Sequence, residues 1–257
     1  MDMPKILYKY IPTDSIKFFF ERKTICFSPS NKFNDPFEIK AKFKNIPRED
    51  IMSLISKSER SIEHFKGKYL SQHILDKSIQ EAFNKSANDY GILCLSSEEN
   101  IILMWSHYAE NHSGLVIGID IEKLIYFLKS KLNIPEPKIK AVSYSKFPFE
   151  INSLIDITNI VSIYFNKYEA WSYEQEWRMI FPCRDIKNSD YKPIPINGVI
   201  TIPENVIHSV TFGVKTTCKT INTIKKYIAN NNFNHVKLKQ AIMSDSEYAL
   251  IIKNYED

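Results

Sequence analysis

The sequence predicts an α+β protein with a mixed, largely antiparallel sheet, whole or split, that is flanked by helices. Segments with the two-residue period of strands and the 3.6-residue period of helices follow one another without regular β–α–β alternation. Hydrophobic residues make up 44% and aromatic residues 13% of the chain, which excludes intrinsic disorder. Because 257 residues can bury one large core, we expect a single domain, 1–257, with a helical insertion at about 48–88.

The first part of the chain alternates short strands with helical segments. Ile16, Phe19 and Phe20 share one face of the first expected helix. Asn34 and Asp35 stand directly before a proline, which favours a turn. The elements expected here are a strand at 5–11, a helix at 13–22, a strand at 24–29, a loop at 31–38 and two amphipathic helices between 48 and 88.

The middle of the chain contains the most continuous apolar segment. Leu115–Asp120 is apolar at nearly every position, as expected for a strand that is buried on both faces. Ser96 stands three residues before Glu99, the spacing of a capping box, which predicts that a helix packing through Trp105 begins there. The elements expected here are strands at 92–95, 115–120 and 139–145 and helices after 96, at 121–132 and at 154–168.

The segment Trp171–Phe181 gives the best indication of chemistry. Interpreted as one strand, it places aromatic and apolar residues on one face and Glu174, Glu176 and Arg178 on the other. The apolar face belongs in a core, so the charged row either faces water or lines a cleft. The remaining expected elements are strands at 193–202, 207–213, 235–242 and 247–253 and a helix at 216–230.

Composition and charge exclude several classes of protein. The net charge of +4, without a run of like charges, fits a nucleotide or nucleic-acid ligand but does not require one. With 6 glycines and no Gly-x-Gly-x-x-Gly or P-loop pattern, the common phosphate-binding loops are excluded. The 4 cysteines lie far apart, so we expect reduced, buried thiols and no metal site. Without a signal-peptide pattern or a long apolar stretch, we expect a soluble, cytoplasmic protein with no membrane contact.

Four blocks of sequence together resemble the bacterial family known as domain of unknown function 2971. The blocks are Tyr8–Tyr10, Phe27–Pro29 leading into Phe33–Glu38, Met104–Tyr108 with His112–Gly114, and Tyr173–Arg178. The resemblance covers most of the chain. It implies that these blocks form a shared site or core, and by itself it implies no activity.

The order of the blocks is also similar to that of ADP-ribosyltransferases. Those enzymes have a basic or polar residue on a first strand, a serine-containing strand followed by a helix, and a late strand with Glu-x-Glu. Lys9 or Tyr8, then Ser96, then Glu174 and Glu176 stand in that order here. The chain departs from the pattern in having Lys where Arg or His is usual, an approximate serine motif, and a helical insertion.

This second resemblance implies that NAD is the substrate. Glu176 would hold the ribose 2′-hydroxyl and stabilise an oxocarbenium-like transition state, and Glu174 would orient or deprotonate the acceptor or water. The other residues implied to support or bind NAD are Ser96, Tyr8, Lys9, Tyr10, Phe33, Arg178 and His107. The expected function is ADP-ribosyl transfer to a protein or nucleic acid, or NAD hydrolysis, and it would suit a bacterial toxin or phage-defence protein.

Two other functions stay open on the sequence. One is a non-catalytic ligand-binding or interaction module whose acidic row binds a basic partner. The other is a magnesium-dependent nuclease that uses Asp120 with Glu174 and Glu176. Purely structural roles also stay open, because Ser96 can cap a helix and Lys9 can be a solvated charge. The oligomeric state is not predicted.

Overall fold

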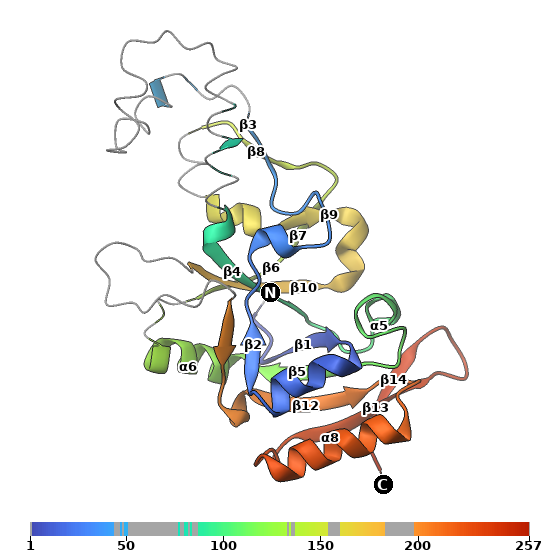
Figure 1. Ribbon diagram of the computed structural model, residues 1–257. Helices are drawn as coiled ribbons and strands as arrows, with labels where there is room; N and C mark the ends of the chain where they lie inside the picture. The colour runs from blue at the N-terminus through green and yellow to red at the C-terminus, as the bar shows by residue number, and fades with distance from the viewer. Residues whose placement is uncertain are drawn as a thin grey trace.

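The computed structural model describes residues 2–43, 47, 49–50, 77, 80–81, 83, 87–132, 134, 137–153, 160–182 and 198–256. One eight-stranded sheet and three two-stranded sheets are accompanied by helices, which confirms the α+β class (Figure 1). The strands are β1 (Ile6–Ile11), β2 (Thr24–Cys26), β3 (Ala41–Phe43), β4 (Tyr90–Ser96), β5 (Leu115–Asp120), β6 (Lys138–Ala141), β7 (Ser143–Ser145), β8 (Phe149–Ile151), β9 (Asn166–Tyr168), β10 (Glu176–Pro182), β11 (Val199–Thr201), β12 (Ile207–Phe212), β13 (Lys237–Met243) and β14 (Leu250–Asn254). The α-helices are α1 (Ile16–Phe20), α5 (Ile102–Tyr108), α6 (Ile121–Leu132) and α8 (Cys218–Asn230), and the 3-10 helices are η1 (Thr13–Ser15), η2 (Ser30–Lys32), η3 (Ala87–Asp89), η4 (Ile160–Phe165), η5 (Glu169–Glu174) and η6 (Glu204–Val206).

The large sheet has the strand order β14-β13-β12-β5-β1-β4-β10-β6. Its neighbours are antiparallel except β12 and β13, which are parallel and are joined through α8. Every residue of β5 is buried, as its continuous apolar sequence predicts. The sheet is therefore mixed and largely antiparallel, in agreement with the sequence.

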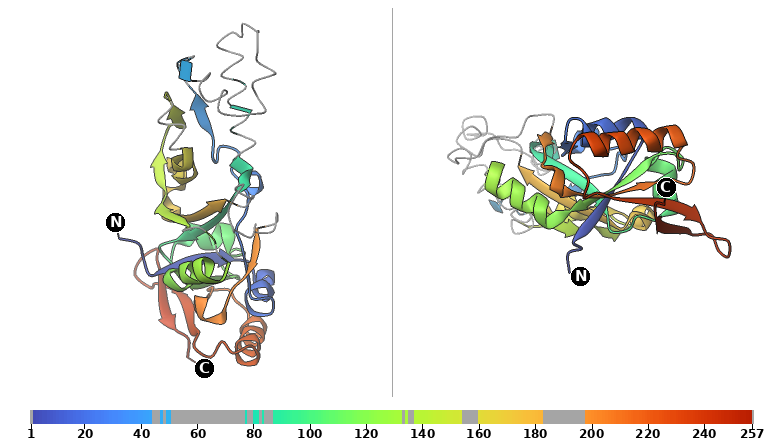
Figure 2. Two further views of the ribbon diagram at one scale, coloured as in Figure 1. Left: turned by 90° about the vertical axis from the view of Figure 1, so that its left-hand side faces the viewer. Right: turned by 90° about the horizontal axis from the view of Figure 1, so that it is seen from below.

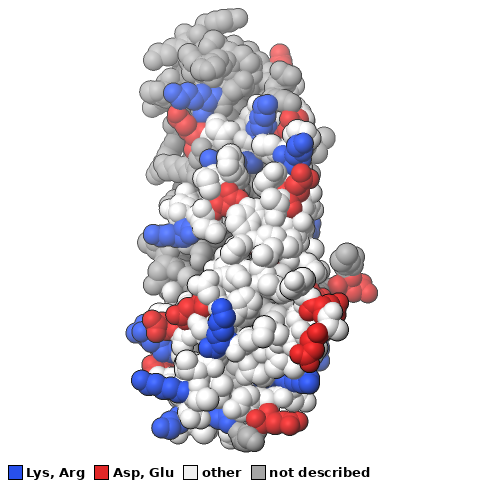
Figure 3. Space-filling model, turned by 90° about the vertical axis from the view of Figure 1, so that its right-hand side faces the viewer, with Lys and Arg blue, Asp and Glu red and all other residues white. Residues whose placement is uncertain are grey.

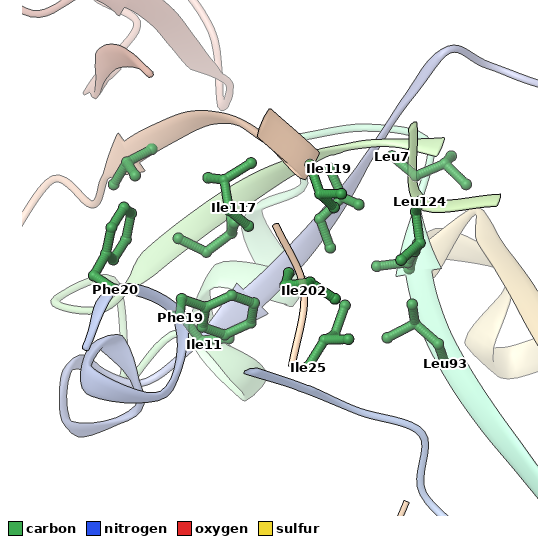
Figure 4. Close-up of a cluster of buried hydrophobic side chains, with 14 of the residues drawn as sticks. Leu7, Ile11, Phe19, Phe20, Ile25, Leu93, Ile117, Ile119, Leu124 and Ile202 are labelled. Atoms are coloured by element: carbon green, nitrogen blue, oxygen red, sulfur yellow. The ribbon is translucent and has the colours of Figure 1, made fainter. Parts of the chain in front are cut away.

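The two faces of the large sheet pack against different helices. Apolar residues from alternate positions of β1 and β5, including Leu7, Ile11 and Ile117, form a first core cluster with side chains of α1, α6 and α8 (Figure 4). On the opposite face, Tyr10 and Val116 pack with Trp105 of α5 in another cluster. The face that carries α5 is also the face on which the candidate site lies.

The sheet is nearly divided between β1 and β4. Tyr8 and Ser96 are the one pair of residues in register between these strands, whereas β1 pairs with β5 along its whole length. The strands therefore diverge on one side of this pair. This divergence corresponds to the split that the sequence allowed, and it opens the hollow described below.

A smaller core lies on the face of β4 and β10 that is opposite to the first core cluster. Ile92 and Ile180 pack there with Ile39, Ile151 and Tyr164, next to the β3–β8 pair. Figure 1 and the left view of Figure 2 place β3 and β8 at the opposite end of the molecule from α8. Because β4 and β10 contribute to both cores, they connect the two ends. That the chain forms a single domain stays a prediction.

The interpretation of Trp171–Phe181 as one strand is wrong in its first half. Residues up to Glu174 form η5, and Gln175 adopts a left-handed conformation with φ of 44° before β10 begins at Glu176. A residue in that conformation turns the chain sharply. Within β10 the predicted alternation is confirmed, because Trp177 and Met179 enter the first core cluster while Glu176 and Arg178 face the other way.

The capping box predicted at Ser96 is also wrong. Ser96 is the last residue of β4, and α5 begins only at Ile102 after the non-capping residue Ile101. The side chain of Ser96 instead donates a hydrogen bond to the carbonyl oxygen of Glu174 at 2.7 Å. The same hydroxyl accepts a hydrogen bond from Glu98 N at 3.2 Å, but no helix begins in the described residues between Glu98 and Ile102.

Two other segments are divided where the sequence predicts one continuous element. The strand expected at 139–145 is divided into β6 and β7, which belong to different sheets, and the helix expected at 154–168 is η4 followed by β9. Two cysteines expected to be buried, Cys26 and Cys218, are exposed. Most of the insertion expected at 48–88, residues 154–159 and residues 193–197 lie outside the described residues.

The face of the molecule in Figure 3 carries interspersed acidic and basic residues around a broad uncharged area. This distribution agrees with the small net charge of +4 and the lack of like-charge runs in the sequence. Among the described residues, no helix combines the length and apolar character needed to cross a membrane.

Candidate functional site

A cavity of about 480 Å³ lies where β1 and β4 diverge. Its size suits a small organic ligand, for which pockets of about 300–1,000 Å³ are usual. The lining combines aromatic, acidic and basic side chains from distant parts of the sequence. The lining residues are Tyr8, Lys9, Tyr10, Ser28, Lys32, Phe33, Asn34, Glu38, Ile92, Cys94, Leu95, Ser96, Met104, His107, Tyr108, Lys167, Glu174 and Glu176.

Strand register places three of the predicted site residues in one row. Ser96 of β4 is paired with Tyr8 of β1 on one side and with Glu176 of β10 on the other. Residues that are paired across a sheet project from the same face, about 5 Å apart from strand to strand. The chain thus brings its N-terminal block, its serine strand and its second glutamate to one wall of the cavity.

A cluster of buried charged side chains forms the floor of the cavity. Lys167 of β9 lies 2.6 Å from Glu174 Oε2, 3.1 Å from Glu176 Oε2 and 3.1 Å from Glu38 Oε1. Arg178 donates through Nε to Glu176 Oε1 at 2.8 Å and through Nη2 to Glu38. Three carboxylates thus share two cations, and all five side chains are at most 7% exposed.

The environments of the two glutamates push their pKa values in opposite directions. Burial alone would raise the pKa of Glu176, but the Arg178 guanidinium and the Lys167 ammonium lower it to about 2. Burial raises the pKa of Glu174, and its contacts with Lys167 offset this only in part. Glu176 is therefore a permanent carboxylate near neutral pH, whereas Glu174 takes up a proton more readily.

Aromatic rings cover both cations of the cluster. Lys167 Nζ lies 5.1 Å from the centroid of the Trp171 ring, and the Arg178 guanidinium lies 5.5 Å from that of Phe33. Burial alone would lower the pKa of Lys167, but Glu176, Glu38 and Glu174 together raise it. Lys167 thus stays charged, and the aromatic residues around it limit its access to water.

The turn at Gln175 positions Glu174 relative to Glu176. The Ser96 hydroxyl donates to the Glu174 carbonyl, and Ser97 N donates to the Gln175 carbonyl at 3.1 Å. Tyr108 of α5 donates to Glu174 Oε1 at 2.8 Å. Since β4 and α5 hold the end of η5 from two sides, the side chain of Glu174 reaches the same cavity as Glu176 although it does not belong to the strand.

The N-terminal block contributes a cation and two phenols to the cavity lining. Lys9 Nζ donates to the Cys94 carbonyl at 2.9 Å, in the gap where β1 and β4 no longer pair. Tyr10 donates to the Glu98 carbonyl at 2.9 Å. Burial and the nearby Glu99 raise the pKa of Tyr8 to about 12, so that its hydroxyl remains a donor. Lys9 is thus a half-buried, cavity-lining cation and not a fully solvated charge.

Two further predicted residues take different positions. His107 lines the cavity, and its Nδ1 lies 3.0 Å from the Tyr173 hydroxyl. Arg178 is fully buried behind Glu176 and does not belong to the cavity lining. Arg178 holds Glu176 and Glu38, and the support of NAD expected from it stays a prediction.

The three-carboxylate cluster predicted for a nuclease does not form. Asp120 does not line the cavity, and its carboxylate contacts Lys123 at 3.3 Å. Within the described ranges, no group of three or more metal-binding side chains is placed to hold an ion. Glu174 and Glu176 are also buried, which differs from the exposed acidic row that a surface for basic partners would need.

The sequence analysis missed Lys167 and Tyr108 as members of the site. Lys167 lay in a segment interpreted as a helix, where a lysine is normally exposed. Tyr108 was assigned to the core-facing side of its helix. Tyr108 ends the Met104–Tyr108 block, whereas Lys167 lies outside all four blocks. Glu38 was assigned to the loop expected at 31–38 and to no specific role in the site.

The fold and cavity define an α+β protein with a buried Glu–Lys–Arg cluster at a ligand-sized hollow. The model of the family described as "Protein of unknown function (DUF2971)" matches residues 104–179 of the chain. This match confirms the family resemblance for the blocks at 104–114 and 173–178, and the matched segment includes most of α5, Lys167 and both site glutamates. No curated protein and no solved structure matches the chain.

Proposed function

We propose that the protein binds NAD in the cavity between β1 and β4 and cleaves its N-glycosidic bond, as an ADP-ribosyltransferase or an NAD glycohydrolase. The observation that carries the proposal is that Glu174 and Glu176, whose pKa values are shifted apart, lie in one cavity wall with Tyr8 and Ser96. Titratable groups with opposed shifts in a ligand-sized cavity are typical of acid–base sites.

Glu176 supplies the fixed negative charge that this reaction needs. When the bond between ribose C1′ and the nicotinamide nitrogen breaks, the electron pair leaves with nicotinamide and positive charge develops on the ribose. A carboxylate that is ionised and held in place before the reaction stabilises this charge without reorganising. Its two salt-bridge partners keep Glu176 ionised.

Glu174 completes the reaction as the proton acceptor. Water or an acceptor group attacks C1′ and releases a proton, which the Glu174 carboxylate takes up. The raised pKa of Glu174 makes it the better base of the two glutamates. Lys167 bridges the two carboxylates, so it positions both of them without touching the substrate in this scheme.

The remaining cavity residues match the other parts of NAD. Lys9, Lys32 and His107 offer positive charge or hydrogen-bond donors to the diphosphate. Tyr8, Tyr10 and Phe33 offer ring faces to the nicotinamide or adenine bases. These assignments rest on side-chain chemistry, and NAD binding itself is the first point to test.

The test combines ligand binding with turnover in two matched variants. NAD should raise the melting temperature of the wild-type protein, because a ligand that binds only the folded state stabilises it. Nicotinamide release should fall by at least about a hundredfold in Glu176→Gln, as expected when a charge-stabilising group is lost. Glu169→Gln, in the same η5 but exposed, is the control and should keep wild-type release.

The outcomes separate folding, binding and catalysis. The melting temperature of each variant without ligand shows whether it folds. If folded Glu176→Gln released nicotinamide at the wild-type rate, the catalytic proposal would be wrong. If NAD left the melting temperature of the wild-type protein unchanged and no nicotinamide appeared, both binding and cleavage would be excluded.

A further inference from the structure

A second concave surface, the β3–β8 groove, lies beside the candidate site. It has a volume of about 700 Å³ and is lined by described residues from the β3 segment, the β7–β8 connection and β9. The lining residues are Phe37, Ile39, Lys40, Ala41, Lys42, Phe43, Lys77, Gln80, Ser145, Lys146, Phe147, Pro148, Asn166, Lys167 and Tyr168. No Asp or Glu occurs among these described lining residues, whereas five of them are lysines, of which Lys167 is already paired with the carboxylates of the candidate site.

Large aromatic side chains are exposed at this groove. Phe37 is 75% exposed, Phe147 is 70% exposed and Tyr168 is 47% exposed. They come from three separate segments, yet all three line the same surface. Lys40 Nζ lies 5.9 Å from the centroid of the Phe37 ring, so ring and cation are presented together. Converging, exposed rings of this kind indicate a binding surface rather than scattered exposure.

The groove and the cavity share a wall. Lys167 lines both, and its Nζ contacts Glu174 and Glu176. Glu38 lines the cavity, while its chain neighbours Phe37 and Ile39 line the groove. A molecule held in the groove would therefore have one end next to the carboxylates.

We infer that the β3–β8 groove binds single-stranded nucleic acid. Exposed rings stack on unpaired bases, and the lysines around them neutralise phosphates, which is the combination that single-strand-binding surfaces use. The bound strand would also be placed to accept ADP-ribose, and this second role rests on the proposed NAD cleavage. The binding of the strand itself does not depend on NAD cleavage.

The same features distinguish this ligand from other polyanions. The bases of a duplex are stacked on one another inside the helix and are closed to protein rings. An acidic peptide would satisfy the lysines but would leave Phe37 and Phe147 exposed to water. An anionic bilayer is broad and flat at its surface, whereas these residues line a concave groove.

The test is fluorescence anisotropy with the full-length protein and a labelled oligothymidylate of about 12 nucleotides, a length within the site size of known single-strand binders. Phe37→Ala and Phe147→Ala should each raise Kd at least about fivefold, the smallest effect expected for one lost stacking ring. Lys42→Ala should weaken binding and reduce its salt dependence. Tyr126→Ala, which removes a 71% exposed ring of α6, and Lys226→Ala of α8 should bind like wild type.

Competition experiments and turnover complete the test. Duplex DNA of the same length, polyglutamate and vesicles of anionic phospholipid should displace the probe poorly. Failure of the wild-type protein to bind, wild-type binding by both Phe variants, or efficient displacement by any of these competitors would overturn the inference. Nicotinamide release is measured on the same Phe variants and should be unchanged, so that a failure of strand binding is distinguishable from a failure of NAD cleavage.

Discussion

At the scale of single residues, the site is organised by Lys167. Its ammonium group contacts Glu38, Glu174 and Glu176, which come from three separate elements of the chain. Burying carboxylates is costly unless they are paired and hydrogen-bonded. One cation that satisfies three carboxylates fixes the relative positions of the loop after β2, the end of η5 and the start of β10. Catalytic geometry and local stability thus depend on the same side chain.

Replacing Lys167 should destabilise the protein strongly. Lys167→Met keeps much of the side-chain volume but removes the cation that Glu174 contacts and leaves Glu38 and Glu176 with Arg178, and we expect a loss of about 3–5 kcal/mol in the free energy of unfolding. Urea denaturation at neutral pH measures it. Lys226→Met, exposed on α8, is the control and should change stability by less than about 0.5 kcal/mol. A loss below about 1 kcal/mol would show that the cluster does not hold these elements together.

The acid side of the stability profile should depend on Glu176. Its pKa is about 2 in the folded protein and 4.5 ordinarily, so the folded state binds its proton less tightly. The stability that it contributes, about 3 kcal/mol at 1.4 kcal/mol per pKa unit, is present above pH 4.5 and is lost as the pH falls toward 2. Glu174 has a raised pKa, so its protonation favours the folded state, but this gain in stability is made as the pH falls from the raised pKa to 4.5, above the range in which Glu176 acts.

Urea denaturation between pH 8 and 2.5 tests these two signs. Glu176→Gln should flatten the fall of stability below pH 4.5, whereas Glu174→Gln should remove a gain of stability that acidification gives above pH 4.5. Glu169→Gln leaves both groups in place and should keep the wild-type slope. Identical slopes in all four proteins would show that neither glutamate is responsible for the pH dependence.

Several residues expected from the sequence line the same cavity in the structure. Glu176 and Ser96 were located because strand periodicity and block order are local signals, and register then placed them side by side with Tyr8. Lys167 could not be found this way, because its partners are determined by the packing of β9 against η5 and β10. Arg178 was placed on the correct face of its strand, but its depth behind Glu176 depends on contacts with Glu38 from far along the chain.

At the scale of elements, long periodic segments were predicted well and breaks were not. β5, α6 and α8 lie close to the expected positions because each carries an unambiguous apolar pattern. The segment before β10 was mistaken for strand because its alternating aromatic residues fit a period of two. Gln175 turns the chain there, although a residue with a side chain seldom adopts a left-handed conformation.

The break at Gln175 has a functional consequence. In an unbroken strand, Glu174 and Glu176 would project in parallel about 7 Å apart. In the structure, η5 brings Glu174 back toward Lys167 and Tyr108, so that both carboxylates contact one ammonium group. The turn therefore converts a row of charges on a strand into a compact cluster.

At the scale of the whole molecule, β4 and β10 connect the two ends of the fold. Leu93, Met179 and Phe181 belong to the first core cluster, while Ile92 and Ile180 belong to the core beside β3 and β8. Successive residues of the same two strands thus enter different cores. Loss of either core exposes strands that the other core needs, so we expect the described parts to unfold together.

Urea denaturation of single-tryptophan variants tests this cooperativity and the prediction of a single domain. Trp105 lies on the α5 face of the sheet and Trp177 lies in the first core cluster, so a variant that keeps only one of them reports on one region. Trp171, near Lys167, reports on the cavity floor. If the chain is one cooperative unit, the three fluorescence transitions and the far-ultraviolet circular dichroism transition should coincide once differences in midpoint caused by the substitutions are taken into account. An earlier Trp171 transition, with the circular dichroism signal largely retained, would mean that the site region unfolds as a separate unit from the sheet.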